Sequence, residues 1–149
     1  MIGSDEDWVL FDTNILVYAH DGKSPFYKKA KRLQELVNDG KLKAAITPQN
    51  LLEFYSTITN RAKYKNSVTP KEATLEIKRF LISPFELIVP IGNELLTVMY
   101  LIDGKNILGR RIFDVYLVAT MLSNGIKTIY TANEQDFASF SEIKVVNPF

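Results

Sequence analysis

Three acidic residues of this chain stand directly beside large apolar residues. Asp12 follows a run of four large apolar residues, Glu53 lies between leucine and phenylalanine, and Asp114 lies between phenylalanine and valine. Burying an ionised carboxylate without a partner costs several kcal/mol, so each one needs a cation, a hydrogen-bond donor or a metal. A metal would satisfy all three, and Asp136, with Asn133 as a neutral oxygen ligand nearby, is a fourth candidate.

This set of oxygen ligands favours one kind of chemistry. Clustered carboxylates are stabilised by a hard cation such as Mg²⁺, which polarises phosphoryl oxygens and lowers the pKa of bound water. The chain has no cysteine, and His20 is its only histidine. Thiol catalysis and zinc-thiolate sites are excluded, and Ser-His-Asp hydrolysis fits poorly, whereas metal-assisted phosphodiester hydrolysis needs neither residue type.

Each acid also has a purely structural explanation. Asp12 could cap a helix, since aspartate before an apolar run is a favoured N-cap. Glu53 could pair with a nearby surface cation, and Asp114 with an arginine three or four residues earlier. Asp136 and Asn133 could serve only in capping and turns. The cations in question are Arg61 or Lys63 for Glu53, and Arg110 or Arg111 for Asp114.

The elements around the acids alternate between strand and helix patterns, which predicts an α/β fold with a mostly parallel central sheet covered by helices on both faces, in three layers α/β/α. Asp12, Asp114 and Asp136 fall at the ends of different elements, on what should be one edge of the sheet. Helices between about 48 and 82, with no strand between them, form an arm to one side. We expect strands at 8–11, 44–46, 85–89, 128–130 and 144–146, and helices at 15–19, 25–38, 48–58, 70–81, 93–102 and 112–123. Ser24 and Thr47 are expected to cap the second and third of these helices, and Thr69 with Glu72 has the form of a capping box at the start of the fourth.

The overall composition is that of an ordinary globular protein. The chain has 149 residues, 46% apolar and 23% charged, and we expect one domain spanning 1–149. No run is long and apolar enough for a membrane span, and the acidic start at 5–7 is unlike a signal peptide, so we expect a cytoplasmic protein. The net charge of +1 is not the clear excess of a dedicated nucleic-acid binder, although local basic clusters exist.

Several short motifs, in an order that spans nearly the whole chain, resemble the PIN domain. Within that family the match is closest to the single-domain toxin ribonucleases of the VapC type. The motifs are Phe11-Asp12-Thr13-Asn14-Ile15-Leu16, Glu53 in a helix after a strand, Gly109-Arg110-Arg111-Ile112-Phe113-Asp114 with Val118-Ala119-Thr120, Thr131-Ala132-Asn133, and Asp136-Phe137.

The resemblance implies a catalytic site in a single PIN-like domain. Asp12, Glu53 and Asp114 would be the core acids that hold Mg²⁺ or Mn²⁺ and activate water for RNA cleavage. Asp136 joins them as a catalytic residue, and the metal ligands would be Asp12, Asp114 and Asp136. Supporting roles fall to Thr13 and Asn14, which would orient Asp12, to Thr131 beside the metal, and to Asn133.

The fourth acid is where the chain departs from the family pattern. Many members carry an acid two residues after the threonine, where this chain has Asn133. Either Asp136, three residues later, supplies the charge, or the site works with three acids and an amide.

The resemblance also implies partners. It predicts an RNA substrate, a cognate antitoxin protein whose tail enters the groove, and a homodimer, with no membrane association. Arg110 and Arg111, one turn before Asp114, are candidates for holding the RNA backbone, because arginine commonly contacts phosphate oxygens.

Two other functions compete with the nuclease. A non-catalytic PIN-like module could grip RNA or a protein without holding metal, as Asn133 suggests. A phosphoryl-transfer domain could use Asp12 as nucleophile, but such phosphatases want a second aspartate where Asn14 stands.

Overall fold

The computed structural model describes residues 7–149, and Asp5 and Glu6 of the acidic start lie outside that range. Its centre is a five-stranded sheet in the order β3-β2-β1-β4-β5, in which every neighbouring pair is parallel. The strands are β1 (Val9–Phe11), β2 (Ala44–Ile46), β3 (Glu86–Leu87), β4 (Thr128–Tyr130) and β5 (Lys144–Val146). All five predicted strands are present, and the parallel sheet is confirmed.

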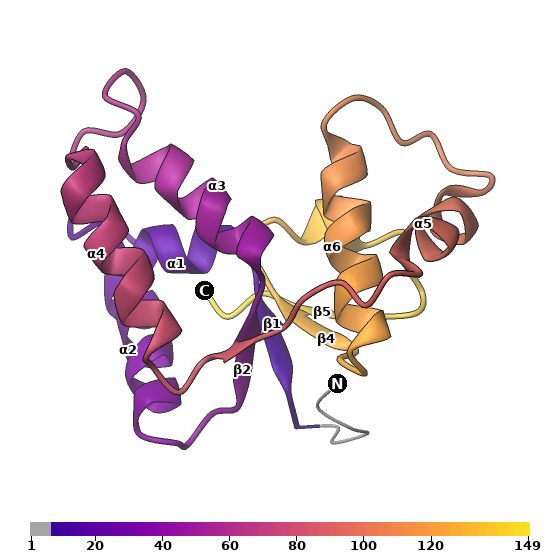
Figure 1. Cartoon of the computed structure of the whole chain (residues 1–149), viewed down its shortest axis with the longest axis horizontal. Helices are drawn as coiled ribbons and strands as arrows, with labels where there is room; N and C mark the ends of the chain where they lie inside the picture. Colours follow the sequence, from indigo (N-terminus) through magenta and orange to yellow (C-terminus); the bar gives the residue numbers. More distant parts are fainter. Residues whose placement is uncertain (1–6) are drawn as a thin grey trace.

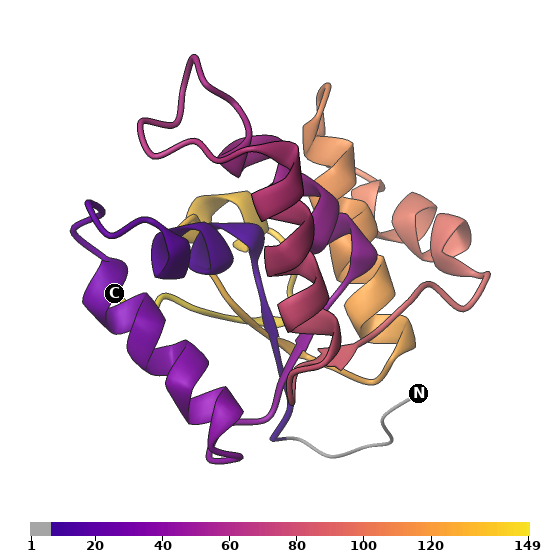
Figure 2. The same ribbon diagram turned by 60° about the vertical axis from the view of Figure 1, so that its left-hand side comes forward.

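Helices cover both faces of the sheet, so the three-layer α/β/α prediction is confirmed (Figure 1). Helices α1 to α4 lie on one face and α5 and α6 on the other, and the turned view in Figure 2 shows the same division. The helices are α1 (Thr13–His20), α2 (Tyr27–Asn38), α3 (Pro48–Ile58), α4 (Pro70–Leu81), α5 (Glu94–Ile102), α6 (Arg111–Ser123) and α7 (Glu134–Phe137).

The core is divided by the sheet into two apolar clusters. Alternation along β1 sends Val9 and Phe11 into the cluster beneath α1 to α4, and Leu10 into the cluster beneath α5 to α7. Phe54 of α3 and Val118 of α6 are fully buried members of the first and second clusters, respectively. Because both faces are buried, all three β1 residues are apolar, as is typical of a central parallel strand.

The position of β1 at the centre of the sheet places the end of this strand beside the ends of its neighbours. Phe11 pairs with Tyr130 of β4, and the Asp12 amide donates to the Tyr130 carbonyl oxygen at 3.0 Å. On its other side, Leu10 pairs with Ala45 of β2. The residues that follow β1, β2 and β4 therefore meet at one edge, where ligands bind in open α/β sheets.

Most helix boundaries agree with the sequence patterns. The Thr69 hydroxyl accepts from the Glu72 amide while the Glu72 carboxylate accepts from the Thr69 amide, which is the predicted capping box. Gly125 follows α6 with a φ of +80°, a left-handed conformation that suits glycine. The helices of the predicted arm, α3 and α4, pack against each other in the same layer as α1 and α2.

Two helix starts and one additional helix differ from the prediction. Helix α1 begins at Thr13 because Asp12 caps it, and α7 is an additional short helix. The second helix begins at Tyr27 instead of at 25, so the prediction that Ser24 caps it is wrong. The Ser24 hydroxyl and carbonyl oxygens accept from the amides of Phe26 and Tyr27, both at 3.1 Å, and close a turn before the helix.

No helix within residues 7–149 combines the length and apolar character needed to cross a membrane.

Candidate active site

Asp12 lies at the point where β1 ends and α1 begins, and its side chain is 8% exposed. One carboxylate oxygen, Oδ1, accepts from the Thr13 amide at 2.8 Å. The other, Oδ2, accepts from the Thr131 hydroxyl at 2.8 Å and from the Asn14 amide nitrogen at 3.2 Å. Asp12 is therefore a helix cap and a fixed acid at once, so the structural explanation and the functional one coexist.

Asn14 and Thr131, both predicted as supporting residues, join the ends of β1 and β4. The Asn14 side chain donates to the Thr131 hydroxyl at 3.2 Å and accepts from the Ala132 amide at 3.3 Å. The Thr131 hydroxyl also accepts from the Asn133 amide at 3.0 Å. This network fixes the Asp12 carboxylate by side chains from two strand ends, with Thr131 fully buried beneath it.

Glu53 reaches the same edge from α3 on the neighbouring side. Its Oε2 accepts from the Thr13 hydroxyl at 2.8 Å, and its Oε1 accepts from the Gln49 side chain at 2.9 Å. The Thr13 hydroxyl in turn accepts from the Asn50 amide nitrogen at 3.2 Å. Among the described residues no cation pairs with Glu53, so the alternative of a surface ion pair with Arg61 or Lys63 is not what the structure shows.

Asp114 and Asp136 approach from the opposite layer. Asp114 lies in the first turn of α6 and is half-buried, and Asp136 lies in α7. Burial raises the pKa of Asp114 from 3.8 to about 6, with further increases from the charges of Asp12, Asp136 and Glu53 and a decrease from Arg111. Burial likewise raises the pKa of Asp12, against the hydrogen bonds from Thr131 and Thr13, and the charges of Glu53 and Asp136 add to the increase.

These mutual effects show that the four acids share one electrostatic environment. The donor set suits a hard cation, because it consists of carboxylate oxygens with hydroxyl and amide oxygens around them. Within residues 7–149, no three acidic side chains lie close enough together to coordinate one metal ion. Glu53 is turned toward its partners Thr13 and Gln49.

The two arginines before Asp114 have different surroundings. Arg111 points toward α7, where its terminal nitrogen Nη2 donates to the Asp136 carbonyl oxygen at 3.3 Å, and its Nε is buried without a hydrogen-bond partner among the described residues. Arg110 is exposed. Neither forms an ion pair with Asp114 within residues 7–149, so the predicted structural alternative for Asp114 is not observed.

A groove of about 530 Å³ runs beside the acids between α3 and α6. It is lined by Thr13, Leu52, Glu53, Ser56, Thr57, Arg110, Arg111, Phe113 and Asp114. A second hollow, of about 430 Å³, lies at α7 and is lined by 132–136. Several predicted site residues line these two hollows, whereas Asp12, Asn14 and Thr131 line neither. The first is lined by Thr13, Glu53, Arg110, Arg111 and Asp114, and the second by Asn133 and Asp136.

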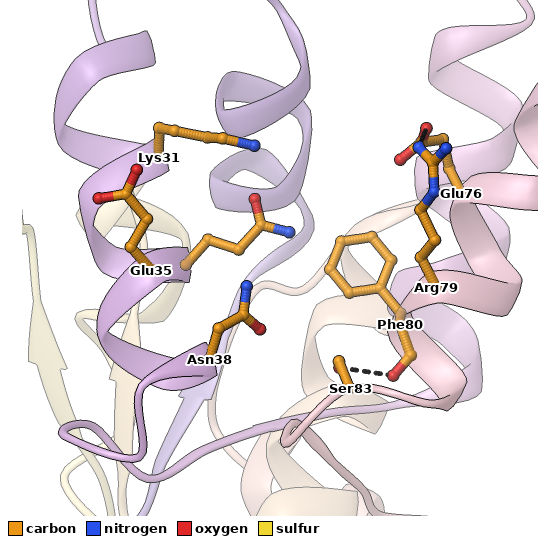
Figure 3. A pocket seen from close by; sticks show the side chains of 8 residues that line it. Lys31, Glu35, Asn38, Glu76, Arg79, Phe80 and Ser83 are labelled. Atoms are coloured by element: carbon orange, nitrogen blue, oxygen red, sulfur yellow. Dashed lines mark hydrogen bonds and ion pairs between the residues drawn. The ribbon is translucent and has the colours of Figure 1, made fainter.

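A different hollow, of about 240 Å³, lies between α2 and α4 (Figure 3). Its charged residues Lys31, Glu35, Glu76 and Arg79 carry both signs, and Arg79 is paired with Glu76. The Ser83 hydroxyl there donates to a backbone carbonyl oxygen of the same segment. None of the four site acids lines this hollow, so it does not offer the chemistry of clustered carboxylates.

Two residues of the site were missed in the sequence. Asn50 is completely buried and forms a capping box with Thr47, and the signal for it was an amide three residues after a predicted cap. Gln49 lies one turn before Glu53, and its side-chain nitrogen also donates to the Phe113 carbonyl oxygen at 3.0 Å. Gln49 therefore connects α3 to α6 directly.

Comparison with known proteins agrees with this architecture. The sequence profile described as "PIN domain" matches residues 9–143. The chain belongs to the PIN domain family. It is similar to Ribonuclease VapC48 of Mycobacterium tuberculosis, with 29% identity over 140 residues that cover 93% of this chain and 96% of the relative.

Solved structures with low identity share the fold. One is VapBC2 from Rickettsia felis bound to a DNA fragment from its promoter, with a TM-score of 0.66, 19% identity and coverage of 94% of this chain and 98% of that one. Another is VapC20 from Mycobacterium tuberculosis, a toxin that cleaves the sarcin-ricin loop, with a TM-score of 0.65, 15% identity and coverage of 91% and 98%.

Proposed function

We propose that this PIN-domain protein is an endoribonuclease that hydrolyses RNA phosphodiester bonds. The observation that carries the proposal is that Asp12, Glu53, Asp114 and Asp136 approach the carboxyl edge of the sheet, where burial raises the pKa of Asp12 and Asp114 and the charges of neighbouring acids add to the increase. The similarity to a protein named as a ribonuclease supports the reaction and the substrate class.

The proposed cofactor is Mg²⁺ or Mn²⁺, held by Asp12, Asp114 and Asp136. When bound, such an ion polarises a phosphoryl oxygen and lowers the pKa of its water. The chain supplies the positioning. Thr131 and the Thr13 amide fix the two oxygens of Asp12, and the Thr13 hydroxyl together with Gln49 fixes those of Glu53.

The arginines have separate roles in this proposal. Arg110 is exposed and lines the groove, where it would contact RNA phosphates. Arg111 holds the backbone of α7 at Asp136, so it positions the fourth acid and offsets part of the negative charge. The backbone amide of Asn133 donates a hydrogen bond to the Thr131 hydroxyl and supports this end of the site.

Cleavage of RNA by purified protein tests the proposal. Wild type and Asp114→Asn are incubated with structured RNA in Mg²⁺, in Mn²⁺ and with a chelator. We expect cleavage by wild type only, and only with metal. Equal cleavage by the two proteins would indicate a contaminating nuclease and refute the assignment.

We further propose that the protein is the toxin of a toxin–antitoxin pair, with an antitoxin protein as partner and a homodimer as its own assembly. Solved complexes with the same fold include one described as a toxin-antitoxin complex from Klebsiella pneumoniae, which supports the partner. Induced expression in a bacterial host should arrest growth, and Asp12→Asn should not. Light scattering of the purified protein measures the oligomeric state.

A non-catalytic binding module is the second candidate. Two observations favour it: Asn133 stands in place of an acid, and within residues 7–149 no three acidic side chains lie close enough together to hold one metal ion. Calorimetric titration with Mn²⁺ separates the two. Millimolar or tighter binding that is lost in Asp12→Asn contradicts the module, whereas RNA binding without any metal uptake supports it.

A further inference from the structure

Phe113 is a large apolar side chain that the fold leaves 54% exposed. It lies in the first turn of α6, immediately before Asp114, while most later apolar residues of this helix are buried. Single exposed apolar residues are common on protein surfaces and need no explanation by themselves. The position of this ring, and not its exposure alone, is what points to a ligand.

The ring lies on the wall of the groove beside the acids. Arg110 and Leu52 line the same groove, together with Glu53 and Asp114. Exposed basic, aromatic and acidic side chains are thus brought to one hollow from α3 and α6. On α5, by contrast, Tyr100 is 70% exposed but lies outside this groove.

The backbone that carries the ring is fixed relative to Glu53. The Gln49 side-chain nitrogen donates both to the Phe113 carbonyl oxygen at 3.0 Å and to Glu53 Oε1 at 2.9 Å. A single amide group therefore ties the start of α6 to a site acid on α3. A ring held in this way binds a flat ligand with little loss of backbone freedom.

An exposed aromatic ring beside an arginine is the arrangement with which proteins bind unpaired nucleotides. Bases stack on the ring while the cation contacts the backbone, and such stacking does not require a particular sequence. In a duplex, base faces are covered by their neighbours, so sequence-reading proteins take unstacked bases from loops and single strands.

We propose that Phe113 stacks on an unpaired base next to the phosphate that enters the acidic site, and that this contact supplies part of the affinity for RNA. This inference rests on the proposed ribonuclease function and names a residue that contacts the substrate. Arg110 contacts the phosphate beside that base.

The test measures RNA binding without cleavage. In an Asp12→Asn background, which prevents cleavage, binding of a short unstructured oligoribonucleotide is compared with that of an abasic oligomer of equal length. Phe113→Leu removes the ring and keeps an apolar side chain, Phe113→Trp keeps a ring, and Tyr100→Leu is the matched control. Circular dichroism confirms that each variant is folded.

We expect Phe113→Leu to weaken binding of the base-bearing RNA by about 5-fold or more, since stacking is worth roughly 1–3 kcal/mol per base. Binding of the abasic oligomer should not change, Phe113→Trp should restore affinity, and Tyr100→Leu should match the background.

Three results would overturn the inference. If Phe113→Leu binds the base-bearing RNA normally, stacking at Phe113 is wrong while the ribonuclease proposal survives. If Phe113→Leu weakens both oligomers equally and converts a dimer to a monomer in light scattering, the ring is a contact between copies. If the folded wild type neither binds nor cleaves RNA, the proposed function fails, and this inference fails with it.

Discussion

Removing the charge of Asp114 should stabilise the metal-free protein while abolishing its activity. Burial raises the pKa of this carboxyl group from 3.8 to about 6, with the charges of Asp12, Asp136 and Glu53 adding to the effect. The folded protein therefore binds more protons than the unfolded chain between these two values. The Asp114 charge destabilises the fold above pH 6, and this cost disappears as the pH falls toward 3.8.

The size of the effect follows from the same values. A pKa change from 3.8 to about 6 corresponds to about 3 kcal/mol, at roughly 1.4 kcal/mol per pH unit. Asp114 is only half-buried, so solvent screening reduces this figure, and we expect Asp114→Asn to gain about 1 to 2 kcal/mol at pH 7.5. For a chain of this length the gain raises Tm by roughly 2 to 8 °C.

Urea denaturation with a chelator present, repeated between pH 4 and 7.5, measures this gain. The difference between Asp114→Asn and wild type should be largest above pH 6 and should shrink toward pH 4. Added Mn²⁺ should stabilise wild type more than the variant. Asp103→Asn, which removes an exposed acid outside the site, is the control and should behave as wild type. A variant no more stable than wild type at pH 7.5 would contradict the raised pKa of Asp114.

Three further predictions concern neighbouring positions. Thr13→Val removes the hydroxyl that donates to Glu53, so kcat for RNA cleavage should fall by about 10- to 100-fold with little change in KM. An unchanged kcat would mean that Glu53 does not need this hydrogen bond. Asn133→Asp adds a carboxylate beside the site and should tighten Mn²⁺ binding by about tenfold in calorimetry, whereas unchanged affinity would place position 133 outside the metal environment. Phe54→Ala removes a buried ring that packs edge-on against Phe80 and should cost about 3 to 5 kcal/mol in urea denaturation, and a loss below about 1 kcal/mol would contradict the tight packing inferred there.

Much of the fold could be predicted because local patterns and packing agree. Strand and helix patterns alternate along the chain, and capping signals such as Thr69 with Glu72 mark helix starts. Together they predicted the strands and most helices correctly. Helix α7 could not be predicted, because its four residues are too few to show a helical period. The start of α2 was misplaced because a serine hydroxyl can close a turn as readily as it caps a helix.

The acids of the candidate site could be predicted from the sequence, but their hydrogen-bond partners could be predicted less well. Asp12, Glu53 and Asp114 were recognisable because each carboxylate interrupts an apolar stretch. The hydrogen-bond partners of Glu53 could not be recognised in the same way. Thr13, which donates to Glu53, lies 40 residues earlier in the chain, and the Asn50 side chain contacts Thr13 and not Glu53. Adjacent arginines likewise look equivalent in the sequence, and only the packing of α6 against α7 turns Arg111 inward.

The division of the core by the sheet has a consequence for how activity can evolve. Glu53 belongs to the helix layer over one cluster, Asp114 and Asp136 belong to the layer over the other, and Asp12 stands on the strand between them. The spacing of the carboxylates therefore depends on the volume of interior side chains on both sides of β1. A change of one methylene group in either cluster can shift the four acids relative to one another while each of the four stays the same. Selection can thus tune this site from the interior, through residues that no substrate touches.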